Sequence, residues 1–87
     1  MDGDIVSLIL LKEGDEGIIH HVLGGNGIIG RLASMGITSG VRIKVVRNIG
    51  GPVIITANGT RIAIGRRQAQ QIAVNISRAG KGNAGSA

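Results

Sequence analysis

The amino-acid sequence predicts a mainly β fold, a small and strongly bent barrel of about five short strands with one or two short helices. The 87 residues are too few to divide between two cores. Apolar residues make up 43% of the chain and include no Phe, Tyr or Trp, so the core must consist largely of branched aliphatic side chains, which favour strands. Sixteen glycines and a single proline indicate many tight turns between short elements.

Five segments have the apolar pattern of short strands and are separated by turn residues. In one of them, Val41, Ile43 and Val45 alternate with Arg42 and Lys44, as in a strand with one buried and one solvated face. An Asn-Gly pair between two of the segments is typical of a hairpin. The five segments are residues 18–23, 41–46, 53–57, 61–64 and 72–76.

One or two short helices are expected between these strands. Asn26 has the residue type of an N-cap, and Ile28, Leu32 and Met35 then fall on one helical stripe. Gly36 supplies the left-handed residue that commonly ends a helix. The polar segment before the last strand, residues 65–71, offers one further helical turn or a 3₁₀ segment.

Short strands joined by tight turns suit an SH3-like barrel, with an OB-type barrel as the alternative topology, because a closed barrel removes exposed sheet edges. We expect residues 1–78 to form one domain. The tail, residues 79–87, has no apolar periodicity and is expected to be disordered.

Charge is distributed unevenly along the chain. All five acidic residues lie within the first sixteen positions, where with Lys12 they give a formal charge of −4 and leave +9 for residues 17–87. The positive charge of residues 17–87 favours an acidic partner, which could be nucleic acid, an anionic membrane or a protein. The alternative is that the basic side chains only solvate the outer faces of the strands. Since the chain has no aromatic side chain on which bases could stack, nucleic acid is the less favoured partner.

The chain contains no cysteine, which excludes disulfides and thiolate metal sites. No stretch approaches the ~20 apolar residues of a transmembrane helix, and the N-terminus is unlike a secretory signal. We therefore expect a cytoplasmic protein with no membrane span.

Three motifs have residue types that could form a functional site. Gly25, Gly27 and Gly30 match the dinucleotide pattern G-x-G-x-x-G, but no acidic residue follows Glu16, so we interpret them as turn residues. Arg66 and Arg67 open the second helical turn and could hold an anion there, the alternative being ordinary solvated arginines.

His20 and His21 are the candidate metal ligands. Adjacent residues of a strand point to opposite faces, so the sequence predicts no metal site and no cofactor. No constellation of nucleophile, base and acid can be assembled either, which favours a binding module over an enzyme.

Three stretches, "LILLKEG", "GIIHHVLGGNGIIGRLASMGITSGVRIKVV" and "GPVIITANGTRIAIGRRQAQQIAV", closely resemble the FeoA family of the bacterial ferrous-iron uptake system. The resemblance covers residues 8–76. It implies an SH3-like barrel without enzyme activity and a partner, the cytoplasmic G-protein part of the membrane transporter FeoB. Ser39 and Glu13 stand at turn positions where the family often has proline, which puts the rigidity of those turns in doubt.

The same type of domain ends the DtxR-like iron-dependent repressors, so the alternative function is a regulatory or nucleic-acid-associated module. For the transporter interaction we expect the cleft beside the first helix to provide an apolar anchor and nearby arginines to provide steering charge. Self-association through this helix is a further alternative. The anchor residues are Leu32, Met35 and Ile37, and the arginines are Arg31, Arg66 and Arg67.

Overall fold

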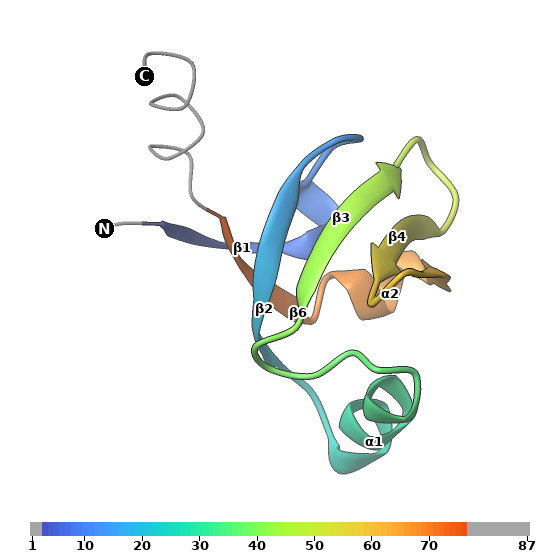
Figure 1. Ribbon diagram of the computed structural model, residues 1–87. Coiled ribbons are helices and arrows are strands. Elements are labelled where there is room, and N and C mark those ends of the chain that lie inside the picture. Colours follow the sequence, from blue (N-terminus) through green and yellow to red (C-terminus); the bar gives the residue numbers. More distant parts are fainter. Residues whose placement is uncertain (1–2, 77–87) are drawn as a thin grey trace.

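The structure is a computed structural model that describes residues 3–76. Within this range the chain forms strands that are joined by tight turns and short helices (Figure 1). The elements are β1 (Asp4–Ser7), the 3₁₀ helix η1 (Leu8–Leu10), β2 (Glu16–Val22), α1 (Asn26–Ser34), β3 (Arg42–Arg47), β4 (Val53–Ala57), β5 (Thr60–Ile64), α2 (Arg66–Ala69) and β6 (Ile72–Ile76).

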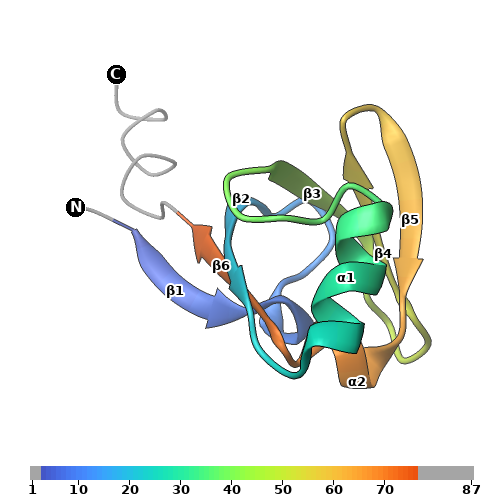
Figure 2. The same ribbon diagram turned by 90° about the horizontal axis from the view of Figure 1, so that it is seen from below.

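The strands form one antiparallel sheet in the order β1-β6-β2-β3-β4-β5. The sheet is strongly bent and wraps around a single interior (Figures 1 and 2). This arrangement confirms the predicted mainly β fold with two short helices.

All five predicted strands are present, and β1 is a sixth that the sequence did not reveal. It is four residues long, lies at the edge of the sheet and pairs with β6 from Asp4 opposite Ile76 to Ser7 opposite Ala73. Only its last two residues are partly buried, so it lacks the alternation that marks the other strands.

The core consists of aliphatic side chains from η1, α1, α2 and strands β2 to β6. The absence of aromatic residues requires this aliphatic composition. In β3 the predicted alternation is confirmed, because Ile43 and Val45 are buried while Arg42 and Lys44 are exposed. The largest fully buried side chains are those of Leu8, Ile19, Leu32, Ile37, Ile43, Val45, Val53, Ile55, Ile64, Ile72 and Val74.

Asn48, in the loop between β3 and β4, ties three parts of the barrel together. Its side-chain amide donates hydrogen bonds to the carbonyl oxygens of Ile9 at 2.9 Å and Leu11 at 2.7 Å. Its Oδ1 accepts a hydrogen bond of 2.8 Å from Nη1 of Arg66 in α2. One polar side chain therefore links η1, this loop and α2.

The predicted disordered tail and the predicted domain boundary at residue 78 lie outside the described residues. Between residues 3 and 76, no helix is long and apolar enough to cross a membrane.

Candidate functional site

Helix α1 lies across one open end of the barrel (Figure 2). Gly25 is its N-cap, with an extended backbone and no side-chain capping bond. Asn26, which the sequence predicted as the cap, is instead the first helical residue. The helix begins one residue earlier than predicted, because glycine is tolerated as an N-cap. Glycine has no side chain that could accept the predicted capping bond, so this bond is absent.

The helix ends as predicted, with Gly36 in the left-handed region at φ 88°. The backbone N–H of Ile37 donates a hydrogen bond of 2.9 Å to the carbonyl oxygen of Leu32, and the N–H of Gly36 donates one of 2.9 Å to that of Ala33. These bonds satisfy carbonyls at the helix end and reverse the chain sharply. The reversal returns Ile37 to the core and leaves Met35 on the outside.

The three predicted anchor residues therefore do not share a surface. Leu32 is 0% exposed and Ile37 is 1% exposed, so both belong to the core, whereas Met35 is 39% exposed. Arg31 is exposed and lies four residues before Met35, which puts the two on the same side of the helix. We call this pair, Arg31 and Met35, the α1 flank.

A shallow hollow lies on the other side of α1, where the helix faces β2. Its volume is about 390 Å³, and Ile29, Ile37, Thr38 and His21 are among the residues that line it. Ile29 is 40% exposed. The sequence did not single out Ile29, because it falls outside the helical stripe of Ile28, Leu32 and Met35 on which the helix was predicted.

Arg66 does not join the α1 flank. Its Nη1 donates to Oδ1 of Asn48 and, at 3.2 Å, to the carbonyl oxygen of Gly51, which holds the side chain on the loop between β3 and β4. Arg67 is exposed. Because α2 is only four residues long and the Arg66 guanidinium already has two acceptors, the geometry favours the alternative of ordinary arginines over an anion site.

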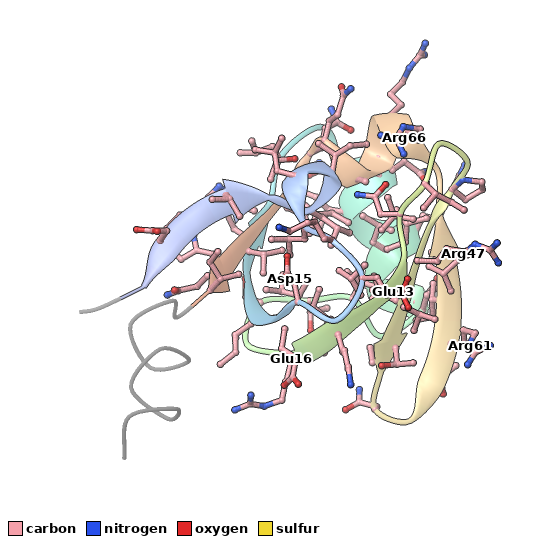
Figure 3. All side chains as sticks on the ribbon, turned by 90° about the horizontal axis from the view of Figure 1, so that it is seen from above. Glu13, Asp15, Glu16, Arg47, Arg61 and Arg66 are labelled. Carbon is pink, nitrogen blue, oxygen red and sulfur yellow. The ribbon has the colours of Figure 1, made fainter. Side chains whose placement is uncertain are left out.

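Other arginines contribute to the positive surface. Figure 3 shows Arg47 and Arg61 projecting outward on the side of β3 and β5, whereas Glu13, Asp15 and Glu16 lie along the segment that leads into β2. The separation of charge along the chain is not a separation in space, because Glu16 pairs with Lys44 across β2 and β3, and Glu13 lines the same hollow as Lys44. Alternating burial in the strands could have identified Arg47 and Arg61, since both fall on solvated positions.

The prediction that His20 and His21 point to opposite faces is wrong. The pairing of β2 with β6 shifts between Ile19 and His21, because His20 is an additional residue with no partner in β6. This bulge brings the two Nδ1 atoms to 2.6 Å. Their rings meet edge to face, with centroids 4.8 Å apart.

No cluster of three or more His, Asp or Glu side chains able to hold a metal ion occurs between residues 3 and 76. Gly25, Gly27 and Gly30 lie at the cap and inside α1, where added Cβ atoms would meet open space. These three glycines therefore form no tight cradle of the kind that a dinucleotide motif provides.

Comparisons with known proteins agree on one family. The model of the FeoA domain matches residues 6–76. The "Putative Fe(2+) transport protein A" of Methanocaldococcus jannaschii is 46% identical over 76 residues, which cover 87% of this chain and 93% of that protein.

Solved structures show the same likeness. The crystal structure of an iron uptake regulatory protein, FeoA, is 39% identical with a TM-score of 0.77 and covers 82% of this chain and 95% of its own. The solution structure of FeoA from Chlorobium tepidum is 30% identical with a TM-score of 0.75, over 82% of this chain and 70% of that one. These likenesses confirm the predicted SH3-like barrel.

The IdeR protein of T. acidophilum has the same fold within a longer chain. It is 23% identical with a TM-score of 0.76 over 84% of this chain, but only 34% of that chain is covered. This likeness concerns the fold alone.

Proposed function

Because the chain belongs to the FeoA family, we propose that it is a non-catalytic accessory protein of ferrous-iron uptake that acts in the cytoplasm. Its partner is the cytoplasmic G-protein part of a FeoB-type membrane transporter, and its binding modulates transport. The observation that carries this proposal is the match to the FeoA domain over residues 6–76, nearly the whole described structure. The M. jannaschii relative, whose name assigns it to Fe²⁺ transport, supports the same conclusion.

The α1 flank is the surface that we assign to the partner. Met35 offers an exposed, flexible apolar side chain, and methionine adapts readily to the shape of a partner. Arg31 stands beside it and supplies charge and hydrogen-bond donors at the rim. A short helix whose buried face is fixed by Leu32 presents both residues on a rigid support.

Charge outside the flank would act on the rate of association. Arg47, Arg61 and Arg67 are exposed, and residues 17–87 carry a formal charge of +9. Such a field accelerates encounter with an acidic protein surface and weakens with added salt. Arg66 contributes to this field, although its guanidinium is held by Asn48 and Gly51.

A titration followed by NMR tests this function. The isotope-labelled chain is mixed with the purified G-protein domain of the transporter, and the backbone resonances are followed. We expect saturable shifts at Arg31 and Met35, with little change at Ile49, which is exposed on the loop between β3 and β4. A folded domain at high concentration that causes no shift would refute the proposal.

The same sample distinguishes the proposed transporter function from the regulatory alternative. Binding to double-stranded DNA by phosphate contacts would weaken steeply as salt is raised, with a slope set by the number of phosphates neutralised. We expect no measurable DNA binding at physiological salt. Tight DNA binding, together with no response to the G-protein domain, would favour the regulatory function.

A further inference from the structure

We propose that His20 and His21 together bind a divalent transition-metal ion through their two Nδ1 atoms. This site goes beyond the proposed function, and it depends only on the local geometry of β2. It is separate from the α1 flank that we assign to the transporter.

The bulge in β2 is what makes two adjacent histidines usable by one ion. Along β6, Val74 pairs with Ile19 and Ala73 with His21, so His20 is the extra residue on the β2 side. A bulge of this kind bends the strand and redirects side chains, and it is often found at functional sites. In a regular strand the two imidazoles would point to opposite faces.

The backbone at the bulge is held from the side opposite β6. The N–H of Ile19 donates a hydrogen bond of 2.9 Å to the carbonyl oxygen of Val41, and the N–H of Gly40 donates one of 2.8 Å to that of Ile19. The Ser39 hydroxyl donates one of 2.9 Å to the carbonyl oxygen of His20. The segment from Ser39 to Val41 thus fixes the backbone that carries both imidazoles.

The two rings also differ in their surroundings. His20 is exposed, while His21 is half-buried and lines the hollow beside α1 as well as a second hollow of about 250 Å³ beside β1. Half-burial limits the rotamers of His21, while His20 can swing toward or away from it. The pair therefore combines one positioned ligand with one adjustable ligand.

At 2.6 Å the two Nδ1 atoms share one proton in a hydrogen bond, with one nitrogen donating and the other accepting. A metal ion would take the place of this proton, and the ring that had donated it would then carry its proton on Nε2 instead. Two imidazole nitrogens bound at 2.0–2.1 Å to a tetrahedral ion lie about 3.3 Å apart, so the 2.6 Å gap between the Nδ1 atoms must open by about 0.7 Å. A small rotation of the exposed His20 side chain provides this change.

The chemistry of the donors defines the class of ion. Neutral imidazole suits Zn²⁺, Fe²⁺, Ni²⁺ and Cu²⁺, whereas Mg²⁺ and Ca²⁺ prefer oxygen ligands. Because the described residues place no third metal-ligating side chain at the pair, water completes the coordination. Two protein ligands predict moderate affinity and an exchangeable ion.

Zn²⁺ titration followed by proton NMR in D₂O tests the site, using the full chain without a histidine tag. The sequence has two histidines and no Phe, Tyr or Trp, so the aromatic region contains only the carbon-bound protons of the two imidazoles. We expect the signals of both rings to shift together and to saturate at one ion per chain. Mg²⁺ should shift neither.

Single variants distinguish chelation from two independent weak sites. His20→Gln and His21→Gln should each weaken Zn²⁺ binding at least about tenfold, because each removes one half of a chelate. Glu13→Gln, in the acidic turn before β2, should leave the affinity unchanged. Thermal unfolding of each variant verifies that it is folded.

The site is refuted if either histidine variant, when folded, binds Zn²⁺ within about twofold of the parent chain. It is equally refuted if the two rings of the parent chain respond at different Zn²⁺ concentrations or do not respond at millimolar Zn²⁺. None of these outcomes bears on transporter binding, which has its own test.

Discussion

The hydroxyl of Ser39 donates a hydrogen bond of 2.9 Å to the carbonyl oxygen of His20, the extra residue of the β2 bulge. A proline at this position could not make this bond, because it has no hydroxyl group. In this chain Ser39 connects the turn after α1 to the paired histidines.

Ser39→Ala is expected to lower the free energy of unfolding by about 0.5–1.5 kcal/mol, because it removes one hydrogen bond at the protein surface. It should also weaken Zn²⁺ binding, since the backbone beneath the pair becomes less well fixed. Chemical denaturation and the NMR titration measure the two effects. Thr38→Ala, which removes the neighbouring hydroxyl, is the matched control, and an equal effect of both variants would contradict this role of Ser39.

Leu32 and Met35 should respond to substitution in opposite ways. Leu32→Ala is expected to destabilise the fold by about 2–5 kcal/mol, because it leaves a cavity where a fully buried side chain packed. Met35→Lys should change the free energy of unfolding by less than about 1 kcal/mol, since the side chain already reaches solvent. A large loss of stability in Met35→Lys would make Met35 a core residue and remove it from the α1 flank.

Asn48→Ala is expected to lower the free energy of unfolding by about 1–3 kcal/mol, because it leaves the carbonyls of Ile9 and Leu11 without their amide donor. Arg66→Ala removes only the exposed end of the same network and should have a smaller effect. Urea denaturation of the two variants provides the comparison. If Arg66→Ala destabilised the protein more than Asn48→Ala, the network would be centred on the arginine instead.

Asn26→Ala tests the start of α1. Since Gly25 is the cap and Asn26 is already helical, removing the amide should leave stability unchanged or raise it slightly, because alanine favours helix. A loss of about 1 kcal/mol or more in chemical denaturation is what a capping asparagine would show, and it would contradict the observed helix start.

The sequence predicted the parts of the fold that follow from local pattern. Alternation identified β3 and the buried Ile43 and Val45, and the left-handed preference of glycine identified the helix end at Gly36. Edge strand β1 could not be identified in this way, because its four residues are held by pairing with β6, which is distant in sequence.

The candidate site was predicted less well, for two physical reasons. Helical spacing does not distinguish side chains that are buried in the core from those at its margin. It therefore assigned Leu32 and Met35 to the same apolar anchor, although only Met35 reaches solvent. A bulge depends on the register between two strands, and the residue types around His20 do not predict one. The contact between the imidazoles therefore emerged only from the structure.

We propose that this chain binds the G-protein part of the transporter through the α1 flank. Calorimetric titration of that domain with the parent chain, Met35→Lys and Ile49→Lys tests it most directly. Both variants replace an exposed apolar side chain by lysine, but Ile49 lies on the loop between β3 and β4 and is 72% exposed. We predict that Met35→Lys weakens binding at least about tenfold while Ile49→Lys binds like the parent chain, as expected when one apolar anchor dominates an interface. Equal affinity of the parent chain and a folded Met35→Lys variant, or no binding by the parent chain, would contradict the account.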